Sequence, residues 1–540
     1  MMPEIVSKIV TSIVFSCLFF VATFKTLGVM QQCGYKNKAF FTWLKRKDNM
    51  YFNRLSIWAI FAFLFSSLCA LCLSPFGGFA SLIAGVVAMM IVGFTYCVID
   101  SRYALKVPVN VTGRIRRLSV LYVFVIACVC YLILSVLQFL TQIIDSGLSS
   151  VLLISVFAFT PFLLPFLLCF ANGITSVFEN ARNKKFVENA GLVLKNSHAI
   201  HIGIVGSYGK TSVKNILNTV LSEKYSVIAT PESYNTPAGV AKTVNCLNVE
   251  ECDVFIAEMG ARREGDIAEL CALVEPDYAL FTGVCAQHMA TFETEEKLLK
   301  AKCEIVKGVK NAVVCGESLK EKITIATFLT DDEKQKCEYV DGACIKGLTL
   351  EKDRTRFTLE IAGLTPIQVE TAMLGKCAAE NIALACVLAA KLGLTAEEIE
   401  RGLKNVKPVA HRLQLVESGG VFILDDAYNC NERSAREALE ALNRFDGRKI
   451  LVTPGIVEAG ILEEKINLEL GKAIAEYSLN LVVLVGETLI TPVKNGYLSS
   501  GGSAEKLLVT PSLELAKAKL STYVQEGDAI LFLNDLPDVY

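Results

Sequence analysis

A short glycine-rich segment carries residue types that are suited to binding phosphate. Between an apolar run, 202–205, and a stretch of helical character, 213–221, the chain reads Gly206, Ser207, Tyr208, Gly209, Lys210, Thr211 and Ser212. In a strand–turn–helix arrangement, backbone N–H groups and the positive end of the helix face an anion. In such loops the lysine reaches a terminal phosphate and the threonine hydroxyl binds Mg²⁺. We therefore predict a nucleotide site; the alternative, a glycine turn used only for packing, would not need Lys-Thr-Ser at the helix start.

The next apolar run ends on a carboxylate. Residues 255–257 precede Glu258, and parallel strands present their carboxyl ends at one edge of a sheet. A carboxylate at that edge, beside a phosphate loop, can bind Mg²⁺ directly or through water. Taken alone, Glu258 is more often a charge at a strand end. With Lys210 and Thr211 in the same chain, the metal-binding interpretation is favoured.

Length and composition allow several domains and set the two parts of the chain apart. The chain has 540 residues, is 52% hydrophobic and has a net charge of −2. Its mean hydropathy is high, +0.44, and the apolar excess lies before residue 172. This charge balance gives no overall attraction to nucleic acid. The 19 cysteines are scattered, which favours apolar packing over metal or redox use, and reduced thiols fit a catalytic part in the cytosol.

Five apolar stretches have about the length needed to cross a bilayer. They cover 9–30, 55–75, 78–99, 118–140 and 150–172. The first has no clear small-residue cleavage site, so we do not interpret it as a removable signal peptide. Pro161 and Pro165 predict a kink in the fifth stretch.

Lysine and arginine are unevenly distributed among the connections. The loops after the first, third and fifth stretches are basic, whereas the other two carry neither residue type. Basic loops remain on the cytoplasmic side of a membrane. We therefore predict a multi-pass protein of the bacterial cytoplasmic membrane, with its N-terminus outside and residues 173–540 in the cytoplasm.

Beyond the apolar stretches, β-branched runs alternate with helical patterns, which predicts mostly parallel sheets covered by helices. A polar interval, 320–370, predicts a small antiparallel excursion, and an Ala-rich helix is expected at 378–392. A second series has expected strands at 421–424, 449–453, 481–485 and 529–533. We divide the chain into a transmembrane domain, an amphipathic connector, a central domain and a C-terminal domain, at 1–174, 175–198, 199–408 and 409–540.

Several ordered motifs carry a family resemblance over about residues 199–533. They are the loop 206–212, Ser233-Tyr-Asn-Thr-Pro-Ala-Gly239, Glu258-Met-Gly-Ala261, Gly265-Asp266-Ile267, Ala301-Lys302-Cys303-Glu304-Ile305, His411-Arg412-Leu413-Gln414 and Asp425-Asp426-Ala427-Tyr428-Asn429. With these motifs the chain resembles the Mur ligases, ATP-dependent amide-forming enzymes of peptidoglycan synthesis, and most closely the MurF type that adds D-alanyl-D-alanine. The apolar stretches predict an α-helical transmembrane bundle, and the resemblance implies that an α/β part follows it, in which a P-loop central domain precedes a Rossmann-like C-terminal domain.

The resemblance also implies roles for residues around the phosphates. Lys210 and Thr211 would hold the β- and γ-phosphates of ATP and a first Mg²⁺, and Glu258 would bind magnesium. His288 matches a histidine that helps to hold a second metal. Lys302 matches a lysine that is carbamylated in many members, although a solvated helix lysine is its simpler interpretation.

Other matches concern the nucleoside and the substrate. Asn381 matches a residue near adenine, although helix capping explains an isolated asparagine equally well. Arg412 resembles an arginine that reaches the nucleotide as the domains close. Residues that match contacts to ribose and adenine are Asp426, Tyr428 and Asn429, and those that match substrate contacts are Ser233, Asn235 and Thr236.

The chain departs from the family pattern at particular positions. Ile204 replaces the first glycine of the full phosphate-loop pattern, and Gly283 replaces an asparagine five residues before His288. Cys377-Ala378 stands where His-Asn is usual, and His411 replaces a glycine. Pro454-Gly455 and Asn534-Asp535-Leu536 also differ from the family pattern. These departures concern the acceptor amine and the nucleotide geometry rather than ATP and metal binding.

The membrane stretches stand where soluble members carry a domain that grips uridine diphosphate. The resemblance implies that a substrate carboxylate attacks ATP to give an acyl phosphate, which an amine such as D-Ala-D-Ala then attacks. The carboxylate substrate would be a muramyl peptide, nucleotide-linked or lipid-linked. Ligation of another polymer, such as poly-γ-glutamate, a non-catalytic scaffold for wall synthesis and an ATP-driven transporter are the alternatives.

Overall fold

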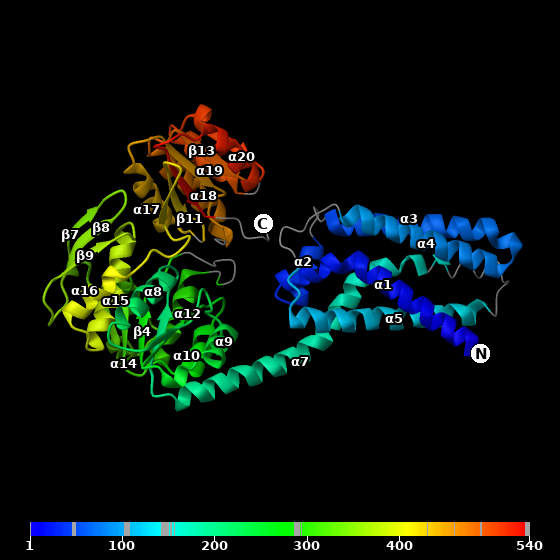
Figure 1. Ribbon diagram of the computed structural model, residues 1–540, viewed down its shortest axis with the longest axis horizontal. Coiled ribbons are helices and arrows are strands. Elements are labelled where there is room, and N and C mark those ends of the chain that lie inside the picture. Colours follow the sequence, from blue (N-terminus) through cyan, green and yellow to red (C-terminus); the bar gives the residue numbers. More distant parts are fainter. Residues whose placement is uncertain are drawn as a thin grey trace. The chain divides into compact units, whose positions relative to one another are not determined.

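The computed structural model consists of two compact units that divide between Lys184 and Lys185, and each is described by itself (Figure 1). The structure describes residues 2–45, 50–101, 109–141, 151, 154–155, 157–285, 292, 294–428, 430–457, 460–486 and 489–534.

The first unit is a bundle of long apolar helices. Its helices are α1 (Met2–Gln32), α2 (Asn37–Leu44), α3 (Met50–Leu73), α4 (Gly78–Ser101), α5 (Gly113–Thr141) and the first part of α7 (Thr160–Asn196). Five helices in the described part of the chain are long and apolar enough to cross a membrane, and each overlaps one of the five predicted stretches. A short 3-10 turn, Ser74–Phe76, joins α3 to α4.

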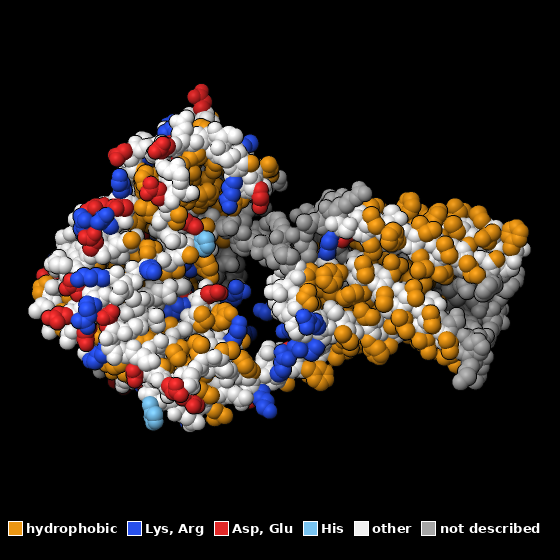
Figure 2. All heavy atoms as spheres, in the orientation of Figure 1, with side chains coloured by type: hydrophobic (Ala, Val, Ile, Leu, Met, Phe, Trp, Pro, Cys, Tyr) orange, Lys and Arg blue, Asp and Glu red, His pale blue; other side chains and the backbone are white. Residues whose placement is uncertain are grey.

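The bundle has apolar side chains both inside and outside. Phe19 and Tyr122 are fully buried in its core, whereas Ile57 and Phe124 are 63% and 62% exposed. Orange apolar side chains therefore cover most of the length of this unit in Figure 2. Exposed apolar surface of this extent marks a site of contact with a membrane or another protein.

A buried acid ties three helices of the bundle together. Asp100 of α4 is 6% exposed and accepts an ion pair from Lys25 of α1 at 2.8 Å. Arg54 of α3 approaches the same carboxylate at 3.4 Å. A paired carboxylate is the form in which a charge is tolerated between apolar helices.

The fifth apolar stretch and the expected connector are one element. Helix α7 runs without interruption from Thr160 to Asn196, so the separate amphipathic helix predicted at 175–198 is wrong. Pro165 lies inside the helix, and no proline occurs between it and Asn196. Because proline is the residue that most strongly ends a helix, nothing in this sequence stops the helix at the end of the apolar stretch.

The second unit begins with a parallel six-stranded sheet. Its strand order is β2-β3-β1-β4-β5-β6. The strands are β1 (Ile200–Val205), β2 (Val227–Ala229), β3 (Val254–Glu258), β4 (Tyr278–Phe281), β5 (Ala312–Gly316) and β6 (Cys337–Val340). The continuous apolar runs of these strands match a sheet that is buried on both faces.

Helices cover both faces of this sheet. The covering helices are α8 (Lys210–Leu221), α9 (Pro237–Cys246), α10 (Asp266–Val274), α12 (Glu295–Gly308), α13 (Lys320–Thr324), α14 (Asp331–Gln335), α15 (Lys376–Lys391) and α16 (Ala396–Lys404). One hydrophobic core joins the sheet to α9, α10 and α12, and the other joins it to α8, α15 and α16. The Ala-rich helix is confirmed as α15, which begins two residues earlier than predicted.

The polar interval contains a small antiparallel sheet, as predicted. Its strands are β7 (Ile345–Leu350), β8 (Thr355–Leu359) and β9 (Ile367–Thr371). Phe357 and Val369 of this sheet are buried against the core that contains α15.

A second six-stranded sheet follows. Its order is β10-β11-β15-β12-β13-β14, with β10 antiparallel at one edge and the other strands parallel. The strands are β10 (Gln414–Ser418), β11 (Val421–Asp426), β12 (Lys449–Thr453), β13 (Leu481–Val485), β14 (Leu507–Thr510) and β15 (Ala529–Leu533). The helices are α17 (Glu432–Asn443), α18 (Glu463–Ala475), α19 (Ile490–Ser499) and α20 (Leu513–Tyr523). All four predicted strands are present, and β10 and β14 are additional.

Candidate nucleotide-binding site

The glycine-rich loop joins β1 to α8 in the predicted strand–turn–helix order. Gly209, at the N-cap of α8, has φ of 75°, a left-handed conformation that glycine adopts without steric cost. Any side chain at Gly206 would overlap the Thr282 hydroxyl, so the loop passes close to the end of β4 because residue 206 is glycine. Ser207 N–H donates to the Gly283 carbonyl at 2.8 Å, which fixes the loop against the same segment.

Two lysines, the buried Lys302 and the half-buried Lys210, converge on one carbonyl of this loop. Lys210 Nζ donates to the Gly206 carbonyl at 2.8 Å, and Lys302 Nζ from α12 donates to the same oxygen at 3.0 Å. Burial, followed by the charge of Lys210, lowers the pKa of Lys302 to about 7. Burial also lowers the pKa of Lys210. The loop therefore carries an excess of positive charge in a dry environment, which an anion would relieve.

Glu258 lies where the sequence predicts a metal ligand. Its carboxylate is 1% exposed and accepts a hydrogen bond from Thr211 Oγ1 at 3.0 Å. Asn235 Nδ2 donates to the other carboxylate oxygen at 3.2 Å. The hydroxyl and carboxylate oxygens of Thr211 and Glu258 are hard donors of the type that Mg²⁺ prefers, so the residues present fit this ion.

Lys214 was not predicted as part of the site. It lies one helical turn after Lys210, is 1% exposed, and forms an ion pair with Glu258 at 3.1 Å. The spacing of four residues from Lys210 on α8 was the available signal, because residues i and i+4 share a helix face. Lys214 therefore balances the charge of Glu258 inside the protein.

His288 and Asn429 lie outside the described residues. Within the described part of the chain, no group of three or more His, Cys, Asp or Glu side chains could hold a metal ion.

Asn381 lies beside the loop and does not cap a helix. The N-cap of α15 is Gly375, so Asn381 is inside the helix and 8% exposed, which excludes the capping alternative. Its Oδ1 atom lies 2.6 Å from the position that a Cβ atom on Gly209 would take. The asparagine thus contacts the phosphate loop directly, and the glycine leaves room for it.

The segment before β10 and the end of β11 bring further predicted residues together. The Arg412 guanidinium lies over the Tyr428 ring at 4.2 Å, and Tyr428 Oη lies 2.6 Å from Ser233 Oγ. Asp426 is 6% exposed and accepts a hydrogen bond from Leu413 N–H at 3.0 Å. Burial raises the pKa of Asp426 to about 7, and the Arg412 charge opposes that rise.

Backbone strain marks the position of Arg412. The residues on either side of it, His411 and Leu413, have φ of 61° and 48°, in the left-handed region where non-glycine residues are uncommon. His411 Nδ1 lies 2.7 Å from Asp425 Oδ2, a contact that stabilises this conformation. Such strain is held only when the surroundings require it, and here it flanks the arginine that was predicted to reach the nucleotide.

Of the predicted substrate residues, two contact other site residues and one has a structural role. Ser233 contacts Tyr428, and Asn235 contacts Glu258. The Thr236 side chain accepts a hydrogen bond from Gly239 N–H at 3.3 Å and caps α9.

Tyr208 joins the loop to α17 through an arginine that sequence reasoning missed. Arg433 Nη1 donates to Tyr208 Oη at 3.2 Å, and the same guanidinium forms an ion pair with Glu380 of α15. A Cβ atom at Gly283 would overlap the Tyr208 phenol. The departure at Gly283 is therefore matched to the tyrosine in the loop, because residue 283 must lack a side chain for Tyr208 to lie here.

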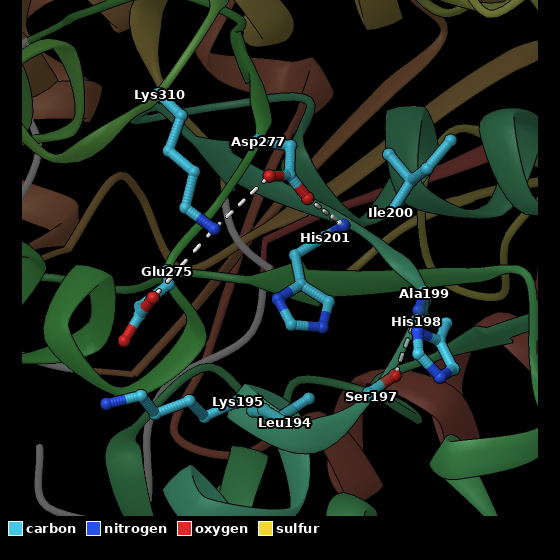
Figure 3. A pocket seen from close by; sticks show the side chains of 10 residues that line it. All are labelled: Leu194, Lys195, Ser197, His198, Ala199, Ile200, His201, Glu275, Asp277 and Lys310. Carbon is cyan, nitrogen blue, oxygen red and sulfur yellow. Dashed lines mark hydrogen bonds and ion pairs between the residues drawn. The ribbon is translucent and has the colours of Figure 1, made fainter.

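A hollow of about 340 Å³ lies at the opposite edge of the central sheet (Figure 3). Ile200 opens β1 and Asp277 precedes β4, so this hollow is at the amino ends of the strands, away from the phosphate loop. Asp277 accepts from His201 N–H at 2.9 Å and pairs with Lys310 at 3.2 Å. The polar residues around this hollow therefore hold the amino ends of the strands in place. We look for the predicted nucleotide site at the carboxyl edge of the central sheet instead.

Comparison with known proteins identifies the arrangement. A family description, the Mur ligase middle domain, matches residues 204–389, the segment that contains the loop, Glu258, Lys302 and Asn381. The chain belongs to the Mur ligase superfamily. Within this superfamily it is MurF-like.

Two curated relatives of this Mur ligase are UDP-N-acetylmuramoyl-tripeptide–D-alanyl-D-alanine ligases. That of Bacillus subtilis is 28% identical over 337 residues, which are 61% of this chain and 72% of that protein. That of Escherichia coli K12 is 28% identical over 313 residues, 56% of this chain and 68% of that protein.

Solved structures show the same Mur ligase fold. MurF ligase from Thermotoga maritima in complex with ADP has a TM-score of 0.56 and 26% identity, and covers 65% of this chain and 80% of that chain. MurF from Acinetobacter baumannii has a TM-score of 0.58 and 22% identity, covers 65% of this chain and 77% of that chain, and supports the fold alone.

Replacing Gly283 tests the fit between this glycine and Tyr208. Gly283→Asn places a side chain where the phenol lies and displaces the Gly283 carbonyl that fixes Ser207, so we expect ATP affinity to fall about tenfold, from an overpacking penalty of about 1–3 kcal/mol. Tyr208→Ser added to Gly283→Asn should restore most of the affinity, with Tyr208→Ser alone as the reference. Calorimetric titration with a non-hydrolysable ATP analogue measures the affinity of each variant. The account is contradicted if Gly283→Asn binds the analogue as tightly as the wild type, or if the double variant binds it no more tightly than Gly283→Asn.

The lowered pKa of Lys302 predicts a pH dependence of stability. Because the folded pKa is about 7 and the usual value is 10.5, the unfolded chain binds more protons between these pH values, and the free energy of unfolding rises with pH there. Lys302→Met should remove most of that rise in buffers free of carbon dioxide. Pulse proteolysis of the solubilised protein measures the free energy of unfolding at each pH, with Lys300→Met at an exposed position as the control. If that free energy rises equally with pH in the wild type and in Lys302→Met, the environment of Lys302 is not dry.

Proposed function

We propose that this chain is a membrane-tethered, MurF-like amide ligase that couples ATP cleavage to peptide-bond formation on a peptidoglycan precursor. Its Mur ligase homologues are ATP-dependent amide ligases. The observation that carries the proposal is the meeting of Lys210, Thr211 and Lys302 with Glu258 at one sheet edge, from segments far apart in the sequence. These groups suit a triphosphate and Mg²⁺, and the carboxylate substrate and amine would then react beside them.

The residues fit ATP and magnesium in the following roles. The 206–212 backbone, Lys210 and Ser212 at the start of α8 would bind the β- and γ-phosphates, while Thr211 and Glu258 would hold Mg²⁺. A pair of Mg²⁺ ions would neutralise negative charge on the phosphates. Asn381, Asp426 and Tyr428 would face the nucleoside, and Arg412 would reach the phosphates.

Lys302 would act as a carbamate. Its lowered pKa leaves a large share of neutral amine near pH 7, and a neutral amine adds to carbon dioxide to give a carbamate and a proton. That change replaces a positive charge beside the Gly206 carbonyl with an anionic oxygen donor. The carbamate would supply an additional oxygen ligand for a metal.

Bond formation would proceed in two steps. The substrate carboxylate attacks the γ-phosphorus, a new P–O bond forms, and ADP leaves. The amine then attacks the acyl carbon, the C–O bond to phosphate breaks, and a proton leaves the nitrogen. The loop N–H groups, and Lys210 once its Nζ leaves the Gly206 carbonyl, would stabilise negative charge in the first step.

The C-terminal part would be a Rossmann-like domain that closes on the nucleotide. The Arg433–Glu380 ion pair and the Ser233–Tyr428 hydrogen bond join it to the central part. The muramyl-peptide substrate would be nucleotide-linked or lipid-linked, and the amine would be D-Ala-D-Ala, as in the names of the relatives.

Phosphate release tests the ligase proposal. Detergent-solubilised protein given ATP, Mg²⁺, a nucleotide-linked or lipid-linked muramyl peptide and D-Ala-D-Ala should release phosphate, because acyl transfer frees it. Lys210→Ala should lower turnover at least 100-fold, since it removes a charge aimed at the phosphates. Lys300→Ala, on the exposed face of α12, should change turnover less than twofold. No release with any donor, despite normal ATP binding, would end the ligase proposal.

Reporter fusions test the membrane arrangement. A reporter that is active only outside the cytoplasmic membrane should be inactive at the C-terminus and active at the N-terminus, because the basic loops predict an odd number of crossings. The reverse pattern, or recovery of the whole chain in the soluble fraction, would contradict the multi-pass proposal.

A further inference from the structure

An ion-pair cluster in the helical unit is not explained by the ATP site. Four residues form it, Arg114 and Arg117 of α5 with Glu179 and Arg182 of α7, and we call them the arginine cluster. Figure 2 shows lysine and arginine side chains gathered at one end of this unit, while the rest of its visible surface is mostly apolar. The cluster belongs to the end where α5 begins.

Glu179 holds two of the arginines in fixed positions. Its side chain is 6% exposed; Oε1 pairs with Arg117 Nε at 2.6 Å and Oε2 pairs with Arg182 Nη2 at 3.0 Å. The Arg117 and Arg182 side chains are nevertheless 47% and 61% exposed. The buried acid therefore orients two guanidinium groups whose other N–H donors face outward.

Arg114 adds a third guanidinium that is also fixed. Its Nη2 donates to Ser176 Oγ at 3.2 Å, and its guanidinium stacks over the Tyr35 ring at 3.7 Å. Its Nε atom is buried and has no hydrogen-bond partner among the described residues. A buried donor left without a partner is uncommon in proteins and indicates a missing acceptor.

The charges of the cluster do not cancel. Three arginines face one glutamate, which leaves a net charge of 3 − 1 = +2. Each guanidinium carries five N–H donors, and the contacts above use one donor of each. The cluster can therefore accept a group with about two negative charges and several acceptor oxygens, which is the character of a terminal phosphate or a diphosphate.

An apolar strip leads away from the cluster. Val120 and Phe124 follow Arg117 at three and seven residues on α5, so all three share one helix face, and they are 72% and 62% exposed. On α7, Phe178 precedes Arg182 by one turn and is 72% exposed. A cationic site that continues into exposed apolar side chains matches a molecule with an anionic head and an apolar tail.

We propose that the arginine cluster binds the phosphate or diphosphate headgroup of a membrane lipid that carries the ligase substrate. The inference rests on the proposed ligase function, because it names the form in which the carboxylate substrate arrives. A lipid with a diphosphate head matches both the +2 charge and the apolar strip. Ordinary phosphodiester lipids carry one negative charge and leave half of that positive charge unbalanced.

Binding of farnesyl diphosphate to the full chain in phosphatidylcholine nanodiscs tests the proposal. The wild type should bind it saturably, while farnesol and inorganic pyrophosphate should compete at least tenfold more weakly because each lacks one half of the ligand. Arg117→Gln and Arg182→Gln should each weaken binding about tenfold or more. Arg116→Gln removes the same charge from a neighbouring exposed position outside the cluster, and it should change affinity less than twofold.

Four results would overturn the proposal. They are an absence of saturable binding, an equal loss in Arg116→Gln, equal competition by inorganic pyrophosphate, and equal competition by phosphatidylglycerol at the same concentration. An equal loss in Arg116→Gln or equal competition by phosphatidylglycerol would show a general anionic-lipid surface, and equal competition by pyrophosphate would show a free phosphate site. Normal binding of farnesyl diphosphate by a protein that releases no phosphate with any donor would contradict the ligase function and leave this site standing.

Discussion

The positive charge buried around the Gly206 carbonyl is the constraint on which the rest of the catalytic unit depends. Lys210 and Lys302 donate to that one oxygen, and Lys214 lies within the same buried region. Glu258 pairs with Lys214, whereas Lys210 and Lys302 form no ion pair with a carboxylate among the described residues. Burial without a counter-charge disfavours an ammonium group, as the pKa of Lys302 shows. A polyanion such as a nucleotide triphosphate would balance this charge.

Much of this arrangement could be predicted because local sequence patterns encode it. Glycines 206 and 209, with Lys210 and Thr211, predict the loop and the start of α8, and parallel-strand topology places Glu258 at the same edge. The five apolar stretches were predictable for a similar reason, since a span requires a continuous run of apolar residues.

The remainder depends on contacts between distant segments. Lys214 is an ordinary helix lysine until Glu258 is placed beside it, and Arg433 gains a role only when α17 meets Tyr208 and Glu380. The expected connector was wrong because a change from apolar to polar composition does not end a helix. Asn381 could be assigned to the loop only once the packing of α15 against Gly209 was known, because an isolated asparagine equally suits a helix cap.

A structure of the full chain with a non-hydrolysable ATP analogue and Mg²⁺ tests the central claim most directly. The account predicts the triphosphate on the N–H groups of residues 206–212, Mg²⁺ beside Thr211 and Glu258, and Lys210 Nζ moved from the Gly206 carbonyl to a phosphate oxygen. A nucleotide bound elsewhere, such as in the hollow beside His201, or an empty loop with both lysines still on the Gly206 carbonyl, would contradict it.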